Sequence, residues 1–514
     1  MHSFPLWSRG APQCGIRGTI LRCAHLWFHA VAGKGNEMRP SGVHSIVINT
    51  LYASGARLAT IIARAVYVVV IANQLGPELY GLFNYGLSWY LLFVPLGIVG
   101  VDEIVVREIG RRSGDSSRVV EASLALRLAT GLIAALASLA LGLALDSSDP
   151  VRSLLLVFAA ALFGRVLSSW SNAVFRGGEA AQYVLVHELG FRMLEVLAGL
   201  VLLSQGFGLL ALAVVHAACW LLQGVASIAF VERRFHPHLR PAVHPGAVPR
   251  LLKAGLPLLA SAFLLGWLVQ GPVVLLRALR GDGEWLGQLA LAVQVYALVG
   301  SVVAELGSAA IPVLTRSADR DDGKTRRFAD AALRVGWLLS GLLTLGAIAL
   351  GDWALGLLFD ADYAAVGSLL PWTTLLVGMH FCSQALWGVL VARAHHATLV
   401  GAAFAGATVF TLAFPPAVGW LDLHGAFLAL ALGYLTVLVT QLRTLARADA
   451  LDWRSASLRP LLAVALALLS CVMLMPVGRL VGLVAGLLVL TLFSLWLDVV
   501  SPAQVRRVLA ARSR

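Results

Sequence analysis

Apolar stretches long enough to cross a membrane alternate with short polar connections along almost the whole chain. A window of about 19 residues finds fourteen such spans. A hydrocarbon core of about 30 Å needs about 20 helical residues at roughly 1.5 Å each, so each span predicts one crossing. The spans are residues 46–74, 82–101, 119–145, 151–174, 182–204, 207–231, 251–276, 288–312, 332–351, 366–392, 398–420, 424–442, 459–475 and 479–498.

The first span has one apolar face and one polar face. At about 100° per residue, Asn49, Arg57 and Arg64 fall on the same side, while the opposite side is aliphatic. An arginine at mid-membrane costs about 2.5 to 3.5 kcal/mol, so it normally faces a bundle interior or a watery cavity. The two arginines therefore predict either a polar cavity or a buried ion pair that only helps packing.

Two later spans also carry polar stripes. The fourth has Arg165 and Asn172 seven residues apart with serines between them, and the fifth has Glu188, Arg192 and Glu195 at i, i+4 and i+7. The third span adds one further arginine. The first half thus holds five arginines at membrane depth against two glutamates, an excess of three positive charges: Arg57, Arg64, Arg127, Arg165 and Arg192 against Glu188 and Glu195.

Basic residues are distributed unevenly between the two sets of connections. With residues 1–45 left out, alternate connections hold 24 basic residues, and the other set holds four. Cytoplasmic loops carry an excess of Lys and Arg, so the pattern predicts that both termini are cytoplasmic.

Composition agrees with a polytopic membrane protein of all-α fold. The chain has 514 residues, 59% hydrophobic and only 13% charged, with a mean hydropathy of +0.82. The net charge of +12 would suggest nucleic acid in a soluble chain, but here the basic residues lie between apolar spans and set topology. The five cysteines have no spacing for a metal site or a disulfide framework, so we expect neither a metal nor another cofactor.

The first 37 residues differ from the rest. They lack the apolar core and small-residue cleavage site of a signal peptide. Met38 and Arg39 directly precede the first span, as expected at a translation start. We therefore interpret the extension as either a mis-assigned start or a cytoplasmic tail.

A weak internal repeat links the two halves of the chain. Residues 76–81 follow the first span, and Glu78-x-x-Gly81 within them is echoed by Glu284-x-x-Gly287 after the seventh. Six crossings separate the copies, so both hairpins enter the membrane in the same direction. This is the arrangement of a parallel repeat, with substrate expected between the halves.

The order of motifs resembles one known family. The polar first helix, the turn Leu75-Gly-Pro-Glu-Leu-Tyr-Gly81 and the segment Val101–Arg112, with Arg107-Glu108 and Arg111, are similar to the polysaccharide flippases of the MOP (MATE-like) superfamily. The second half shares the family's Ala309-Ala-Ile-Pro312 and Leu357–Tyr363 patterns. It departs from the family at Gly271-Pro272, where members often carry an Asp. The resemblance covers residues 43–498 and does not specify substrate.

The resemblance implies a flippase that moves an undecaprenyl-diphosphate-linked oligosaccharide across the bacterial inner membrane by alternating access. Guanidinium groups bind phosphate oxygens bidentately, so the buried arginines suit a diphosphate. The expected partners are this lipid-linked glycan, membrane lipids and glycan polymerase or ligase machinery, with no nucleic acid. We expect Asn49, Asn172 and the arginines Arg57, Arg64, Arg127, Arg165 and Arg192 at the substrate site, and Glu188, Glu195 and Glu305 as the acids able to bind a coupling ion.

Three alternatives stay open. Within the superfamily these are a lipid II flippase and a cation-coupled multidrug exporter. An exporter of cationic compounds should have acidic residues in its cavity, whereas the membrane spans of the first half have an excess of arginines. The third is a membrane glycosyltransferase or ligase, which would need a larger loop outside the cytoplasm than this chain offers.

The predicted organisation has six parts. They are an amino-terminal extension (1–45), a first six-helix lobe (46–231), a cytoplasmic linker (232–250), a second six-helix lobe (251–442), two further helices (459–498) and a basic tail (499–514).

Overall fold

A computed structural model describes residues 43–110, 116–300, 324–393, 395–448, 451–452, 454–497 and 499. For residues 43–59 only the backbone is described. Residues 1–42, which include Met38, and Glu305 lie outside these ranges. The side chains of Asn49 and Arg57 are also outside the description.

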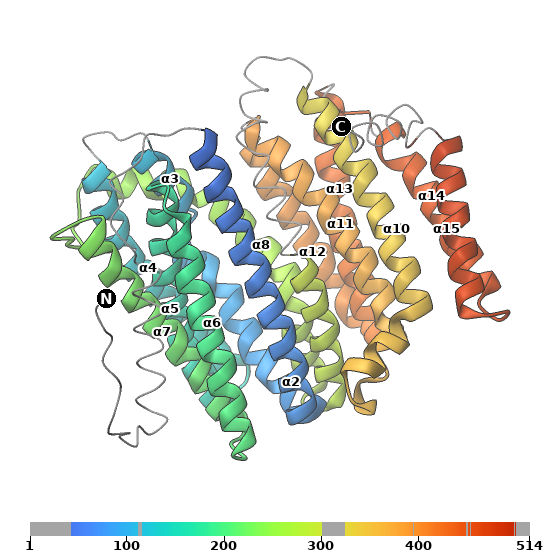
Figure 1. The fold of residues 1–514 in the computed structure, drawn as a ribbon, viewed down its shortest axis with the longest axis horizontal. Coiled ribbons are helices and arrows are strands. Elements are labelled where there is room, and N and C mark those ends of the chain that lie inside the picture. The colour runs from blue at the N-terminus through green and yellow to red at the C-terminus, as the bar shows by residue number, and fades with distance from the viewer. Residues whose placement is uncertain are drawn as a thin grey trace, which may run out of the picture.

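Long helices make up almost all of the described chain (Figure 1). The first half contains α2 (Val43–Ile98), α3 (Asp102–Gly110), α4 (Ser116–Leu145), α5 (Val151–Gly177), α6 (Ala181–Ser204) and α7 (Leu209–Arg234). The second half contains α8 (Ala247–Arg280), a helix over residues 284–300, α10 (Lys324–Leu358), η1 (Ala361–Tyr363), α11 (Val366–Ala392), α12 (His396–Leu421) and α13 (Leu423–Arg447). The chain then forms η2 (Arg454–Leu458), α14 (Arg459–Leu474) and α15 (Arg479–Trp496). The prediction of an all-α membrane protein is confirmed.

Helix α2 contains the first two predicted spans. It is broken at Gly76, whose φ of 71° and ψ of 168° are non-helical, and Pro77 follows. A positive φ is accessible to glycine without steric cost, and proline cannot continue the hydrogen bonding of the preceding turn. The predicted turn therefore separates two helical arms of one continuous element.

Eleven helices of the described residues are long and apolar enough to cross a membrane. Helix α6 is not among them, since its 24 residues include Glu188, Arg192 and Glu195. A charged helix of this kind is stable at membrane depth only when its polar face is turned away from lipid. Helix α6 packs against α2, α5 and α7, which supply that protection.

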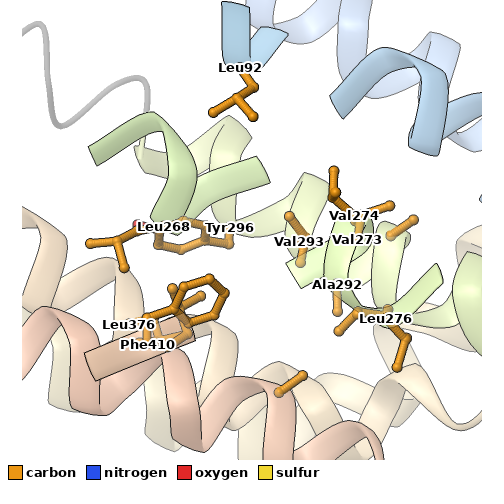
Figure 2. Packing of buried hydrophobic residues seen from close by; sticks show 14 of the residues in the cluster. Leu92, Leu268, Val273, Val274, Leu276, Ala292, Val293, Tyr296, Leu376 and Phe410 are labelled. Carbon is orange, nitrogen blue, oxygen red and sulfur yellow. The ribbon is translucent and has the colours of Figure 1, made fainter. Parts of the chain in front are cut away.

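The helices pack in two sets with α14 and α15 at one edge (Figure 1). Helices α4 to α7 gather around α2, and α8 and α10 to α13 pack among themselves. Figure 2 shows part of the apolar core of the second set, where Leu268 of α8, Leu376 of α11 and Phe410 of α12 lie around Tyr296.

The two repeat-related turns lie against each other. A Cβ on Gly81 would lie 2.7 Å from the backbone nitrogen of Gly287, and a Cβ on Gly287 would overlap the carbonyl of Pro77. Only residues without a side chain allow the backbones to approach so closely. The weak echo in the sequence thus coincides with a direct contact between the two halves.

Further contacts join the halves at the same end. Asn73 of α2 donates from Nδ2 to the carbonyl of Leu358 at 2.9 Å and accepts from the backbone N–H of Asp360 at 3.2 Å. The Tyr363 hydroxyl donates to the carbonyl of Ala72 at 3.1 Å. Because these bonds connect the first span with the connection after α10, they close this end of the bundle.

Candidate binding site

A cavity of about 170 Å³ lies among the helices of the first half. It is lined by both arms of α2, by α5, α6 and α7, and by Gln294 from the second half. Its charged and titratable lining groups come from four helices and converge on one space: Arg64, Arg165, Glu188, Arg192, Glu195 and His216. Ligand pockets usually measure about 300 to 1,000 Å³, so this conformation is narrower than one that admits a large ligand.

Arg64 is the cavity arginine contributed by the first arm of α2. Its side chain is half-buried on the polar face of α2 and lines the cavity. No carboxylate lies within 4.0 Å of it among the described residues. A guanidinium held at membrane depth without a counter-ion has a high affinity for an anion.

Arg165 joins a chain of hydrogen bonds. Its Nη1 donates to the Tyr90 hydroxyl at 3.1 Å, and that hydroxyl lies 3.0 Å from Nε2 of His216. Nδ1 of His216 lies 2.6 Å from Oε1 of Glu195. The carboxylate can only accept, so Nδ1 carries a proton and Nε2 of the neutral ring accepts from Tyr90.

Arg192 completes the chain from the other side. Its Nη1 pairs with Oε2 of Glu195, and its Nη2 donates to Oε1 of Gln223 at 3.3 Å. The guanidinium carbon also lies 4.0 Å from the centre of the Trp220 ring, and that of Arg165 lies 4.8 Å from the same ring. Trp220 therefore stabilises two cations by cation–π contact.

The i, i+4, i+7 spacing places Glu188 and Glu195 within reach of Arg192 along one helix face, and the structure pairs Arg192 with Glu195. Glu188 instead accepts a hydrogen bond from Nδ2 of Asn172 at 2.9 Å. Glu188 lines the cavity, so Asn172 fixes a carboxylate at its wall.

Arg127 lies elsewhere. It is almost fully buried and pairs with Oδ1 of Asp102, whose Oδ2 accepts from the Ser169 hydroxyl at 2.6 Å. These residues join α3, α4 and α5, beside an apolar cluster that includes Val105 and Trp170. Arg127 is not among the residues that line the cavity.

The charge at the cavity is smaller than the sequence count. Three arginines (Arg64, Arg165 and Arg192) against two glutamates leave one positive charge, since Arg127 is neutralised by Asp102 and the side chain of Arg57 is not described. The sign is still positive.

Three aromatic or titratable members of the site are absent from the sequence predictions. Tyr90, His216 and Trp220 lie on spans that read as ordinary apolar helices. The only signal in the sequence is a histidine inside an apolar span, which is too weak to indicate a partner. Only the packing of α2, α5, α6 and α7 brings these residues to the arginines.

The second half holds an uncharged cluster at a related place. Tyr90 follows Gly81 by nine residues, and Tyr296 follows Gly287 by nine. The Tyr296 hydroxyl lies 2.5 Å from that of Tyr434 and 3.0 Å from Nδ1 of His380. This cluster has the hydrogen bonding of the first-half site without its charges.

Within the described parts of the chain, no three His, Cys, Asp or Glu side chains are grouped to hold a metal ion.

Several solved structures share this fold. One is the lipid II flippase MurJ in an inward closed conformation, with 15% identity, a TM-score of 0.64, and coverage of 87% of this chain and 98% of that one. Another is a multidrug resistance MATE family transporter in an inward-facing conformation, at 14% identity, a TM-score of 0.64, and coverage of 77% and 98%. A third is a MOP superfamily transporter from Pyrococcus furiosus, described as having a binding pocket of reverse polarity, at 14% identity, a TM-score of 0.57, and coverage of 78% and 96%. No curated protein matches the sequence significantly.

The architecture is the fold of these MOP superfamily structures, and its long apolar helices define a multi-pass membrane protein. The sequence matches the family described as polysaccharide biosynthesis protein over residues 46–318, more than half of the chain, and the protein belongs to this family. The family resemblance found in the sequence is thereby confirmed.

Proposed function

We propose that the protein moves an undecaprenyl-diphosphate-linked oligosaccharide from the inner to the outer leaflet of the bacterial inner membrane by alternating access. The family supports a lipid-linked glycan as the ligand. The observation that carries the proposal is Arg64, a cavity arginine with no carboxylate partner among the described residues. Its guanidinium lines the cavity together with that of Arg165, where both can bind a diphosphate.

Arg57, two turns before Arg64, belongs to the same proposal. Two turns span about 10 Å along a helix, the distance needed to contact a diphosphate and its adjoining sugar. The proposed coupling-ion acids are Glu188, Glu195 and Glu305. The polymerase or ligase that acts on the exported glycan is the protein partner that this function implies.

Positive charge at the cavity argues against export of cationic drugs. A lipid II flippase is a closer alternative, because its ligand carries the same polyprenyl diphosphate, and the fold is shared with MurJ. Family membership favours a polysaccharide repeat unit over lipid II.

Arg64→Ala tests the proposal directly. Charge-assisted hydrogen bonds contribute about 1.5 to 3 kcal/mol, so the variant should bind a lipid-linked saccharide roughly 10- to 100-fold more weakly and lose export. Arg64→Lys should restore binding only in part, because it keeps the charge and loses the bidentate geometry. Binding is measured on purified protein in lipid nanodiscs, and export by complementation of a glycan-export defect.

Arg233→Ala is the matched control, since Arg233 is an exposed arginine at the end of α7. It should bind and export as wild type. Undiminished binding and export by Arg64→Ala at normal membrane levels would exclude the proposed site. Tighter binding of lipid II than of a polysaccharide precursor would favour the alternative flippase.

A further inference from the structure

His216 is the one titratable cavity group with hydrogen bonds on both sides of its ring. Glu195 accepts from Nδ1 at 2.6 Å, and the Tyr90 hydroxyl lies 3.0 Å from Nε2. The residue is 7% exposed, and its ring also packs against Phe158 and Trp220. Histidine is the side chain whose ordinary pKa lies nearest neutral pH, so a change in its charge would alter the hydrogen bonds on both sides of the ring.

While the His216 ring is neutral, each residue in this series of hydrogen bonds donates to the next. Arg165 donates to Tyr90, Tyr90 donates to His216, and His216 donates to Glu195. Glu195 also accepts from Arg192, so its charge is balanced by that arginine. The proton of the Tyr90 hydroxyl is therefore used within the chain and is not available to a ligand.

An anion in the cavity would compete with Glu195 for Arg192, because both arginine and carboxylate line the same space. If Arg192 turned to the anion, a buried carboxylate would lose its counter-ion, which is strongly unfavourable. His216 already touches that carboxylate and can replace the missing charge by taking up one proton from water.

We propose that binding of an anionic ligand in this cavity is coupled to uptake of one proton by His216. The imidazolium then donates from Nδ1 to Glu195 and from Nε2 to the Tyr90 oxygen. The Tyr90 hydroxyl then no longer donates to His216. Its O–H turns toward the cavity and donates a hydrogen bond to a phosphate oxygen. One proton thus stabilises Glu195 and adds a hydrogen-bond donor for the ligand.

The charges also balance. The cavity has a net charge of one positive unit while His216 is neutral, and two when it is protonated. A polyprenyl diphosphate joined to a sugar carries one negative charge on each of its two phosphates. The protonated site therefore matches such a ligand, and this deepens the proposed function on which it rests.

The charged and titratable groups around His216 come from the helices packed against α7. Tyr90 of α2 and Arg192 and Glu195 of α6 act on the ring directly, and Arg64 of α2 and Arg165 of α5 line the same cavity. Tyr67 of α2 and Cys219 of α7 lie near Glu195. Of these, only Glu195 and Tyr90 touch the ring by hydrogen bonds, so the other charges act on it through space.

Titration calorimetry in two buffers of different ionisation enthalpy tests the coupling. The probe is farnesyl diphosphoryl N-acetylglucosamine, a diphosphate diester with no proton of its own to titrate near pH 7. Wild-type protein in nanodiscs at pH 7.5 should take up about one proton per ligand, and its affinity should fall by about tenfold per pH unit at higher pH. His216→Asn keeps a donor for Glu195 and should show no uptake and a flat pH dependence.

Two further variants complete the test. His187→Asn is the matched control, since His187 is also a buried histidine but bonds the Tyr183 carbonyl and does not line the cavity. It should keep the wild-type uptake. Glu195→Gln removes the carboxylate that holds the imidazolium and should abolish uptake, which provides a second variant if His216→Asn does not fold.

The outcomes separate this inference from the proposed function. Binding by wild-type protein without proton uptake would overturn the role of His216 and leave the anion site intact. Unchanged uptake by His216→Asn or Glu195→Gln would assign the proton to another group. No binding of the probe by wild-type protein would overturn the proposed function itself.

Discussion

Buried arginines in this protein do two different kinds of work, and their partners distinguish them. Arg127 has a carboxylate partner, a position between three helices and no contact with the cavity. Arg64 has a cavity position and no carboxylate partner among the described residues. The first arrangement stabilises the fold. The second allows the Arg64 guanidinium to bind an anionic ligand in the cavity.

Arg127→Ala should therefore reduce stability rather than affinity. Removing one member of a buried ion pair costs about 3 to 5 kcal/mol, because Asp102 is left with an uncompensated charge. Membrane abundance and thermal unfolding in detergent should both fall. Replacing the pair together, as Arg127→Leu with Asp102→Leu, should recover much of the loss.

The measured affinity of the folded fraction decides this point. If Arg127→Ala is as stable as wild type but binds the lipid-linked saccharide weakly, Arg127 belongs to the substrate site after all. Arg192→Ala should give a mixed result, with lower abundance because Glu195 loses its partner and weaker binding because a cavity cation is lost.

At the scale of elements, the Gly81 and Gly287 turns form a close backbone contact between the two halves. Each turn opens a helix that carries a tyrosine nine residues later, Tyr90 or Tyr296. The equal spacing gives each cluster a tyrosine at the same distance along its helix from the glycine. Helices in membranes commonly use small residues for such close packing.

Gly287→Ala should loosen this end of the bundle. The new methyl group would overlap the backbone carbonyl of Pro77, which cannot move aside like a side chain. We expect a loss of about 1 to 3 kcal/mol, the usual range for overpacking, together with reduced export. Thermal unfolding and the complementation assay measure the two effects.

Gly266→Ala in the interior of α8 is the matched control, because nothing lies within 4 Å of the added atom. It should be neutral or slightly stabilising, since alanine favours helix. Equal effects of the two substitutions would show that the turn contact has no special importance.

At the scale of the whole molecule, the end that carries Gly287 is closed by polar contacts as well as by packing. Arg277 of α8 bonds the carboxylate of Asp146 at 2.9 Å, and Tyr363 and Asn73 form the bonds described above. Burial alone would raise the pKa of Asp146, but hydrogen bonds from Ser148 and Arg277 outweigh it and hold that pKa below its usual value. The Arg277–Asp146 pair is therefore charged at neutral pH, and its contribution to stability is lost as pH falls through that lowered pKa.

The orientation of the closed end can be measured. The distribution of basic residues predicts that the connection after α4 is extracytoplasmic and that the one after α7 is cytoplasmic. Single cysteines at the exposed positions Ser147 and Arg240, in a cysteine-free background, should then react differently with an impermeant maleimide added outside intact cells. Only position 147 should be labelled, and labelling at position 240 alone would invert the topology.

The sequence by itself determined the membrane class, the positions of the spans, the polar faces of α2, α5 and α6, and the family. These properties depend on local composition and helical periodicity, which are readable residue by residue. It also indicated that arginines at membrane depth face either a polar cavity or a buried ion pair. It did not distinguish Arg127 from Arg64, because the carboxylate that pairs with Arg127 lies on a different helix.

Tertiary structure decided which charges are paired and which line the cavity. Asp102 lies 25 residues before Arg127, and His216 lies 21 residues after Glu195, so neither pair follows from helical spacing. Tyr90 and His216, which are in contact, lie 126 residues apart in the sequence. Polar side chains in a membrane are more stable when they contact one another than when they face lipid. How the helices pack decides which of them become partners.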